Sequence, residues 1–519
     1  MTFRITYSVL NADLTELHKA FDDALAQVKA RLGKSYPSYI AGQAFESGDL
    51  LEDLNPADTR QVLAKFHKVP VSELDRVMKA AREAQKVWAK VSWQDRAALV
   101  RKAADLISER RLEISAIMSL ETGKNRLESL GDVEESADLF RYYAGQLEET
   151  QGFDRPLGAL SPNEKTRSVL KPYGVFAVLS PFNFPLALAA GMAGGALLGG
   201  NSVVLKPSQE TPWVALKLYE VLRDAGLPSG VFQLVYGTGS DLGAALLRHP
   251  QTDGLVFTGS KRVGMELLRN FSKDYPKPCF LELGGKNPCV VFEKADLNKA
   301  VEGCVRSAFG LSGQKCSALS RIYVQKSLKA EFVKRFQERA AKIVIGDPLH
   351  RDTFVGPVIN KTAYDRYQVA LAEARRDGRV HVGGADASKR PGLEHGFFVD
   401  PVLVEVPHGH RLTRDELFLP FVTLTEFSTR EEALRMANDC EYGLTAGTFS
   451  DDPSDVEYFM DHIEAGVLYA NRLTGATTGA WPGVNSFCGW KGSGSTGKGG
   501  CGPYYVMQFM REQSQTRMT

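Results

Sequence analysis

The sequence lacks the cysteine pattern of several common protein classes. The first 278 of its 519 residues contain no cysteine, and the seven that follow, at positions 279, 289, 304, 316, 440, 488 and 501, form no Cys-x-x-Cys pair. An odd number without such pairs argues against a disulfide framework and against a cysteine-rich zinc site. The natural setting for such a chain is a reducing compartment, so we expect a cytoplasmic protein.

Neither charge nor apolar runs mark a nucleic-acid or membrane protein. The net charge is +1, and no arginine-rich stripe with interleaved aromatic residues is present, so we expect no nucleic-acid partner. A signal peptide is not expected, because Asp13, Glu16, Asp22 and Asp23 interrupt any apolar core near the N-terminus. The longest apolar stretch, Leu186 to Gly200, is too short to cross a bilayer and predicts a buried helix.

Strand and helix patterns alternate in two stretches of the chain. After a mostly helical region over residues 72–151, strands at 202–205, 231–235 and 254–257 alternate with helices. This order favours a parallel sheet with helices on both faces, and residues 284–475 repeat it. We therefore predict two α/β domains, with the chemistry at their junction, where ligand clefts tend to form.

A thiol and a carboxylate stand in separate glycine-marked turns. Cys316 lies in Gly313-Gln314-Lys315-Cys316-Ser317-Ala318, and Glu282 lies in Leu281-Glu282-Leu283-Gly284-Gly285-Lys286. Covalent catalysis through sulfur needs one group that attacks and another that activates the water that clears the intermediate. Because a lone cysteine is more often a packing residue, the assignment depends on the rest of the chain.

Four further segments bear on the binding of an oxyanion or a phosphate. Asn183, in the proline turn 180–185, is placed to donate to an oxyanion together with the Cys316 N–H, or else it serves only its own loop. The turn 257–260 offers helix N-terminal amides to a pyrophosphate. Lys206 ends a strand at the edge of such a sheet where ligands bind. Taken by itself, however, this residue favours the interpretation as a solvated strand-end lysine. The cluster 237–243 is one residue too long for a dinucleotide fingerprint.

Together these segments resemble the aldehyde dehydrogenase superfamily. The matches run in family order over about residues 35–515: Asn183, Lys206-Pro207-Ser208, Phe257-Thr258-Gly259-Ser260, Glu282-Leu283-Gly284-Gly285-Lys286-Asn287, Gly313-Gln314-Lys315-Cys316 and Glu416-Leu417-Phe418. The resemblance implies a bilobal α/β fold with two Rossmann-like domains and a small β flap. It also implies NAD(P) binding, an aldehyde substrate and a homo-dimer or higher homo-oligomer.

The resemblance implies domain boundaries as well. They are an N-terminal helical extension over 1–34, a dinucleotide-binding domain over 35–154 and 172–283, a catalytic domain over 284–475, and an oligomerisation flap over 155–171 and 496–519.

A mechanism and a set of site residues follow from the same resemblance. The Cys316 thiolate attacks the aldehyde, Asn183 holds the oxyanion, hydride leaves for the nicotinamide, and Glu282 activates the water that hydrolyses the thioester. No metal is implied. Cofactor contacts are implied for Ser180, Pro181, Phe182, Lys206, Ser208, Gln209, Gly239, Phe257, Thr258, Gly259, Ser260, Val263, Leu283, Gly284, Glu416 and Phe418.

One departure from the family pattern bears on the cofactor. Gln209 stands where NAD-preferring members commonly carry a glutamate for the adenosine ribose. A neutral side chain removes the repulsion against a 2′-phosphate. The resemblance therefore implies NAD and leaves NADP open.

Two features are similar to the 1-pyrroline-5-carboxylate dehydrogenases within the superfamily. They are the N-terminal extension ending in Tyr36-Pro37-Ser38-Tyr39-Ile40, and Asn471-Arg472 ahead of Thr478-Gly479-Ala480. They imply L-glutamate γ-semialdehyde as substrate, in proline catabolism, because a glycine turn can aim several N–H groups at one carboxylate. The implied substrate contacts are Phe184, Ser317, Gly479, Ala480 and Phe487. The loop between Arg472 and Thr478 is three residues longer than in that subfamily, which leaves a generic glycine-rich loop as the alternative.

Three other functions compete with this one. A CoA-acylating aldehyde dehydrogenase usually lacks the glutamate base, which this chain has. A non-acylating enzyme for another aldehyde, such as succinic semialdehyde or an aromatic one, keeps the same catalytic residues. A non-catalytic binding or structural protein on this fold loses the thiol or the base, and here Cys316 and Glu282 are both present.

Overall fold

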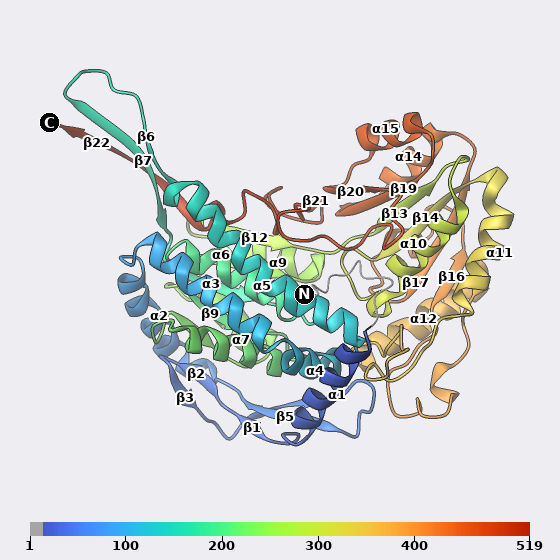
Figure 1. The fold of residues 1–519 in the computed structure, drawn as a ribbon, viewed down its shortest axis with the longest axis horizontal. Coiled ribbons are helices and arrows are strands. Elements are labelled where there is room, and N and C mark those ends of the chain that lie inside the picture. Colours follow the sequence, from blue (N-terminus) through green and yellow to red (C-terminus); the bar gives the residue numbers. More distant parts are fainter. Residues whose placement is uncertain (1–13) are drawn as a thin grey trace.

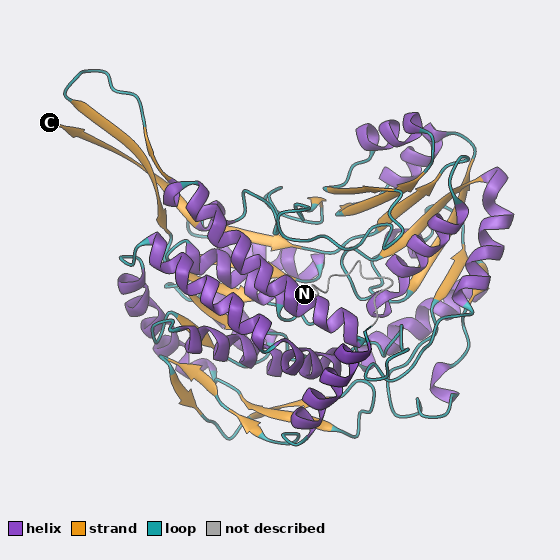
Figure 2. Ribbon diagram, viewed as in Figure 1, coloured by secondary structure: helices purple, strands orange, loops and turns teal. Residues whose placement is uncertain are grey.

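The computed structural model describes residues 14–519 and shows two lobes, each built on a seven-stranded sheet (Figure 1 and Figure 2). Of the predicted N-terminal extension 1–34, residues 1–13 lie outside the described residues. The remainder forms α1 (Thr15–Lys29), whose buried face of Phe21, Leu25 and Val28 packs near α4 (Arg111–Thr122). None of the helices between residues 14 and 519 combines the length and apolar character that a membrane span requires.

The first lobe carries a mostly parallel sheet with the strand order β12-β11-β8-β9-β10-β2-β3. Neighbours from β12 to β10 run parallel, and β2 and β3 add an antiparallel edge. The strands are β2 (Ser38–Ile40), β3 (Gln43–Phe45), β8 (Val175–Leu179), β9 (Ser202–Lys206), β10 (Phe232–Leu234), β11 (Gly254–Thr258) and β12 (Cys279–Glu282). A separate small sheet holds β1 (Ser35–Tyr36), β4 (Leu50–Leu54) and β5 (Val62–His67).

Helices cover both faces of this sheet. Strand β8 shows why a central strand of the sheet is apolar at every position. Phe176 and Val178 belong to the core cluster that contains α5 (Arg126–Glu149) and α6 (Ala187–Leu198), whereas Ala177 and Leu179 belong to the cluster with α2 (Leu74–Trp88). Successive strand side chains point to opposite faces, so a strand covered twice must be apolar at every position. The remaining helices of this lobe are α3 (Trp93–Glu109), α7 (Pro212–Ala225), α8 (Ala244–Arg248) and α9 (Lys261–Phe271).

The second lobe repeats this plan with the strand order β15-β16-β17-β14-β13-β19-β20, in which only β15 is antiparallel to its neighbour. Its strands are β13 (Asn287–Val291), β14 (Leu319–Gln325), β15 (Arg379–Val382), β16 (Val402–Glu405), β17 (Phe421–Phe427), β19 (Thr445–Phe449) and β20 (Val467–Ala470). Its helices are α10 (Leu297–Phe309), α11 (Lys329–Ala340), α12 (Lys361–Asp377), α13 (Arg411–Arg414), α14 (Arg430–Asn438) and α15 (Pro453–His462). A two-stranded ribbon joins β18 (Tyr442–Gly443) to β21 (Trp490–Lys491).

A third structural unit projects away from both lobes at the upper left of Figure 1. It is an antiparallel sheet of β6 (Asp154–Pro156), β7 (Glu164–Pro172) and β22 (Met510–Met518), with β7 in the middle. Within the predicted flap segment 496–519, β22 belongs to this sheet, whereas Val506 and Phe509 are buried in the core of the first lobe. The predicted domain boundaries stay predictions.

The structure follows the predicted element order closely. The predicted α/β class with two parallel sheets and a flap matches the observed architecture. The apolar stretch Leu186–Gly200 forms the buried helix α6, as predicted. The predicted strand 231–235 is shorter, because β10 keeps ladder pairing only over Phe232–Leu234.

Candidate active site

The two groups predicted to carry the chemistry line one cavity. Cys316 and Glu282 both line a cavity that also touches α5 and α6. The structure therefore brings the predicted nucleophile, the predicted base and all five predicted substrate contacts to a single space. Seven further predicted site residues line it: Phe184, Thr258, Leu283, Ser317, Gly479, Ala480 and Phe487.

The loop that carries Cys316 is held in a conformation that side chains rarely adopt. It leaves α10 through the turn Gly310–Gly313, in which Leu311 (φ 49°), Ser312 (φ 53°) and Gly313 (φ 67°) are left-handed. A Cβ on Gly313 would lie 2.1 Å from the carbonyl oxygen of Leu419, so only glycine fits there. Left-handed non-glycine residues cost about 1–3 kcal/mol each and persist where the surroundings enforce them, often at functional sites.

The Cys316 thiol is held in its neutral form. Burial, together with the carboxyl groups of Glu416 and Glu282, raises the pKa of Cys316 to about 12. The backbone N–H groups of Ser317 and of Cys316 itself act on the sulfur in the opposite direction. The thiolate is the attacking form, so these two amides stabilise the charge that the reaction must create.

Glu282 ends β12 beside the turn that was predicted to hold the cofactor. Its main-chain carbonyl accepts a hydrogen bond from the Gly259 N–H at 3.1 Å. Its Oε2 is buried, and no residue from 14 to 519 offers it a hydrogen bond. Burial raises the pKa of Glu282 to about 8. A carboxyl group near this value can take up or release a proton close to neutral pH, as a general base must.

The turn Thr478–Ala480, called the anchor turn below, lines the cavity and carries backbone donors without an acceptor in the described residues. Gly479 has φ 97°, and neither its N–H nor that of Ala480 donates to an acceptor within residues 14–519. The Thr477 hydroxyl donates to the Ser317 carbonyl at 2.7 Å and ties the turn to the nucleophile loop. Two unpaired amides beside the Ser317 hydroxyl are suited to bind a carboxylate.

The predicted cofactor residues of the first lobe gather at one edge of its sheet. The parallel strands end there together, and their pairing sets Thr258 beside Glu282 and Leu179 beside Lys206. In parallel sheets of this kind, ligands bind at the carboxyl edge of the strands. The predicted residues at these strand ends, or in the turns and first helical turns that follow, are Ser180, Pro181, Phe182, Lys206, Ser208, Gln209, Gly239, Phe257, Thr258, Gly259, Ser260, Val263, Leu283 and Gly284.

Lys206 is a buried strand-end lysine rather than a solvated one. Its Nζ donates to the carbonyl of Pro207 at 2.8 Å and to that of Gly237 at 3.4 Å. Burial lowers the pKa of Lys206 to about 8. An ammonium group has three donors, so one remains for a ribose hydroxyl or phosphate oxygen at this edge.

Glu416 and Phe418 reach the first lobe from the second. The Gly285 N–H donates to Glu416 Oε1 at 2.9 Å, and burial raises the pKa of Glu416 to about 7. Phe418 adopts the left-handed conformation (φ 57°), and its ring meets that of Phe182 edge-on at 5.9 Å. The predicted cofactor contacts of the two lobes therefore touch one another.

Asn183 lies next to the cavity but is not among the groups that line it. It is 3% exposed in the turn between β8 and α6, directly before Phe184, which does line the cavity. Its assignment as an oxyanion donor stays a prediction.

Comparison with known proteins adds to this geometry. The model described as "Aldehyde dehydrogenase family" matches residues 44–514. The chain belongs to the aldehyde dehydrogenase family. It is 37% identical over 507 residues to the 1-pyrroline-5-carboxylate dehydrogenase of Geobacillus sp. (strain WCH70), and the match covers 96% of each chain.

Solved structures of aldehyde dehydrogenases have the same fold. The 1-pyrroline-5-carboxylate dehydrogenase from Thermus with bound NAD has a TM-score of 0.94 and 31% sequence identity, with 100% of both chains covered. Proline utilization A (PutA) from Bdellovibrio bacteriovorus, inactivated by N-propargylglycine, has a TM-score of 0.93 and 36% identity. That match covers 97% of the present chain and 52% of the other, so the chain spans about half of PutA. The predicted family and fold class are thereby confirmed.

The residues of this aldehyde dehydrogenase fit a dinucleotide at the sheet edge. Ser260 caps α9 by accepting from the Val263 N–H at 3.4 Å, so the helix begins at this edge. A Cβ on Gly239 would meet no atom within 4 Å, so the space at this glycine is open. A helix N-terminus and a lysine together suit a pyrophosphate and its ribose.

Several cavity residues of the aldehyde dehydrogenase were not anticipated from the sequence. They are Glu135, Tyr143, Lys315, Cys501 and Tyr505. Glu135 comes from α5, where it shares a helix face with Leu139 four residues on. The spacing of four residues between Glu135 and Leu139 indicates a helix face that packs against the core, and it gives no sign of a ligand. Cys501 is buried, and its thiol donates to the Glu135 carboxylate at 4.0 Å.

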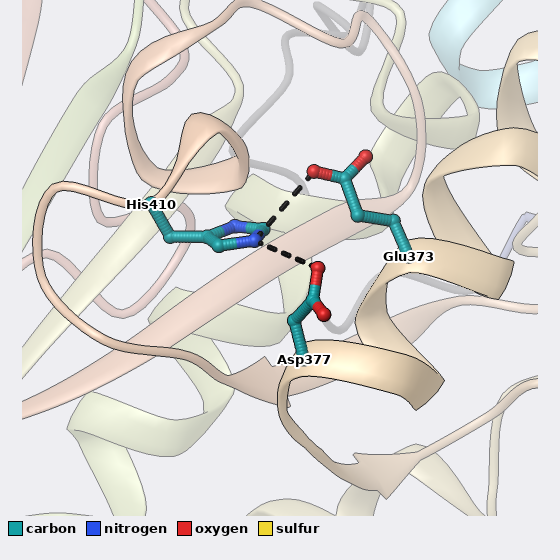
Figure 3. A group of neighbouring side chains, drawn as sticks. All are labelled: Glu373, Asp377 and His410. Atoms are coloured by element: carbon teal, nitrogen blue, oxygen red, sulfur yellow. Dashed lines mark hydrogen bonds and ion pairs between the residues drawn. The ribbon is translucent and has the colours of Figure 1, made fainter.

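A histidine and two carboxylates also meet away from the cavity (Figure 3). His410 Nε2 lies 3.3 Å from Asp377 Oδ2 and 3.6 Å from Glu373 Oε1. Both carboxylates are already held by arginines, since Arg411 pairs with Glu373 and Arg376 with Asp377. An ion-pair network accounts for this group, and we assign it no metal.

Proposed function

We propose that this aldehyde dehydrogenase oxidises L-glutamate γ-semialdehyde, the open form of 1-pyrroline-5-carboxylate, to L-glutamate with NAD. The observation that carries the proposal is the shared cavity of Cys316 and the anchor turn. The thiol suits the aldehyde end of the substrate, and the unpaired Gly479 and Ala480 amides suit its carboxylate. The names of the Geobacillus and Thermus relatives point to the same substrate.

The covalent steps use the chain's own groups. The Cys316 sulfur attacks the aldehyde carbon and gives a thiohemiacetal, whose oxygen the Cys316 N–H and Asn183 stabilise. When bound, NAD supplies the acceptor for the hydride that leaves this carbon. A thioester to Cys316 remains. Glu282 takes a proton from water, and the resulting hydroxide displaces the sulfur to release the acid.

NAD is proposed over NADP because the Thermus relative binds it. The residues that would hold it are Lys206 and Gln209 at the adenosine ribose, Gly259 and Ser260 at the pyrophosphate, and Glu416 with Phe418 at the nicotinamide end. Gln209 carries no charge, so it opposes a 2′-phosphate less than a glutamate would.

We also propose a cytoplasmic homo-oligomer joined through the flap. In its sheet β22 and β6 are edge strands, and an exposed edge offers unpaired backbone groups to a second chain. The compartment rests on the seven cysteines, all of which are unpaired. Light scattering after gel filtration, with and without residues 510–519, tests the assembly.

The substrate proposal is tested by a rate comparison. The kcat/KM values are measured for 1-pyrroline-5-carboxylate, succinic semialdehyde and benzaldehyde, each with NAD and with NADP. We expect 1-pyrroline-5-carboxylate with NAD to exceed benzaldehyde by about 100-fold or more, since a site built to bind a polar group rejects analogues that lack it. A higher value for either other aldehyde would replace the proposed substrate.

A further inference from the structure

Arg472 holds the anchor turn from the side away from the substrate cavity. It follows β20, and its Nη2 donates to the carbonyl oxygen of Gly479 at 2.6 Å. Its guanidinium also lies over the Tyr469 ring, 4.7 Å from the ring centre. A Cβ on Gly479 would lie 3.0 Å from the same Nη2, so the close approach depends on glycine. A charged donor at this distance makes a stronger bond than a neutral one.

This contact fixes the direction of one donor that faces the cavity. In a trans peptide the C=O of one residue and the N–H of the next point in opposite directions. Because Arg472 holds the Gly479 carbonyl on one side, the Ala480 N–H points to the other side. Gly479 and Ala480 both line the substrate cavity, whereas Arg472 does not.

Arg472 lines a second cavity, which shares Lys315, Thr478 and Gly479 with the first. The other basic residues of this cavity are paired with carboxylates: Arg126 and Arg351 with Asp22, Arg306 with Glu302, and Lys315 with Glu128. Within residues 14–519, Arg472 makes no ion pair with a carboxylate. A carboxylate partner would compete for the N–H donors of Arg472. Without such a partner, the guanidinium is free to donate to the Gly479 carbonyl of the anchor turn.

The chain around the turn is fixed independently of Arg472. Asn471 is left-handed (φ 54°), and its side-chain amide makes two hydrogen bonds to the main chain of Ser450, at 3.0 and 2.8 Å. On the other side, the Thr477 N–H donates to Ser307 Oγ at 2.9 Å. Loss of the Arg472 side chain should therefore release the Gly479–Ala480 peptide without unfolding the loop.

We propose that Arg472 is a positioning residue for recognition of the substrate carboxylate. It holds the Gly479 carbonyl outside the cavity and thereby aims the Ala480 N–H at the carboxylate of L-glutamate γ-semialdehyde. It touches neither the substrate nor the reacting atoms. This inference rests on the proposed function, because it concerns only aldehydes that carry a carboxylate.

The test compares Arg472→Met and Arg472→Lys with the native chain. KM and kcat are measured for 1-pyrroline-5-carboxylate and for butanal, which has no carboxylate. Arg306→Met is the matched control, because Arg306 lines the same second cavity but pairs with Glu302. Midpoints of thermal unfolding show whether each variant is folded, and inhibition by glutarate reports on carboxylate binding without turnover.

We expect Arg472→Met to raise KM for 1-pyrroline-5-carboxylate about tenfold, the loss of about one directed hydrogen bond to a charged group. The inhibition constant for glutarate should rise in parallel, kcat should stay within about twofold, and KM for butanal should not change. Arg472→Lys should recover part of the loss, and Arg306→Met should resemble the native chain.

Two outcomes overturn the inference. One is an equal rise in KM for both aldehydes, and the other is no rise with an unchanged inhibition constant for glutarate. If Arg472→Met does not fold, the same criteria apply to Arg472→Lys. Failure of the proposed function looks different, because the native chain itself would then show no preference for 1-pyrroline-5-carboxylate over butanal.

Discussion

The buried side-chain amide of Asn287 holds the main chain of Cys316. Its Nδ2 donates to the Cys316 carbonyl at 2.7 Å and to the Ala318 carbonyl at 2.9 Å, while its Oδ1 accepts from the Thr445 N–H at 3.0 Å. With the Cys316 carbonyl held in this direction, the Ser317 N–H points the opposite way, toward the sulfur it stabilises. One amide from β13 therefore orients the main chain that carries the Cys316 thiol.

Replacing Asn287 with Ala should weaken catalysis more than cofactor binding. Two buried carbonyls lose their donor, which costs about 1–3 kcal/mol for each group left unsatisfied, so the unfolding midpoint should fall. The nucleophile loop loses its direction, so kcat should fall about tenfold or more, while the dissociation constant for NAD stays within about twofold. Asn270→Ala, on the exposed end of α9, is the control. An unchanged kcat would show that the loop keeps its geometry without Asn287.

The reactivity of Cys316 toward iodoacetamide should depend steeply on pH. Because the pKa of Cys316 is raised to about 12, the thiolate fraction in the chain without ligands should grow about tenfold per pH unit from pH 6 to 9. The alkylation rate should follow this fraction without levelling off. Mass spectrometry of the Cys316 peptide measures the rate, and Cys316→Ala supplies the background from the other cysteines. A plateau near pH 7 would mean that the thiol ionises far more easily than its burial indicates.

Glu282→Gln should separate the two halves of the reaction. Glutamine cannot take a proton from water, so steady turnover should fall by about 100-fold or more while a burst of NADH, one per active site, remains. In the native chain kcat should rise with pH up to about 8 and then level off, because the carboxyl group is protonated below the raised pKa of Glu282 and ionised above it. The variant should lack this rise. Loss of the burst together with turnover would place Glu282 in an earlier step.

The sequence was enough to predict which residues line the candidate site, because each stands in a local motif. Cys316 and Glu282 lie in glycine turns, and Lys206 ends an apolar strand, so a few neighbouring residues in the sequence identify the surroundings of each. The fold class followed from the alternation of helix and strand. Contacts between segments that are distant in the chain could not be predicted from the sequence. Asn287 was part of a motif, but its hold on Cys316, 29 residues later, appears only when β13 and β14 pair.

The longer loop before the anchor turn illustrates the same limit. In the sequence, residues 473–477 lie in this longer loop, for which a generic glycine-rich loop was the alternative interpretation. In the structure Ala476 and Thr477 are fully buried, because the Ala476 N–H donates to the Gly303 carbonyl at 3.0 Å and Thr477 bonds Ser307. Small residues allow this approach, since a Cβ on Gly447 would lie 2.1 Å from the Ala476 carbonyl oxygen. Burial of a loop depends on its tertiary partners, which composition does not reveal.

Gln209→Glu should sharpen the preference for NAD. A carboxylate at this strand end would repel the 2′-phosphate of NADP and accept a hydrogen bond from the ribose hydroxyl of NAD. We expect kcat/KM with NADP to fall about tenfold, with little change for NAD. Gln209→Leu removes the polar amide without adding charge. It therefore separates repulsion of the 2′-phosphate from loss of a hydrogen bond to the cofactor. Equal loss with both cofactors would place Gln209 away from the ribose.

Ala480→Asp should act on the substrate carboxylate alone. The new side chain sets a negative charge beside the unpaired amides of the anchor turn, where it repels the substrate carboxylate. We expect KM for 1-pyrroline-5-carboxylate to rise about tenfold or more and KM for butanal to change little. Ala480→Asn has nearly the same size and no charge, so a difference between the two variants measures charge rather than bulk. If both variants raise both KM values alike, the anchor turn shapes the cavity without binding the carboxylate, and another group must recognise that end of the substrate.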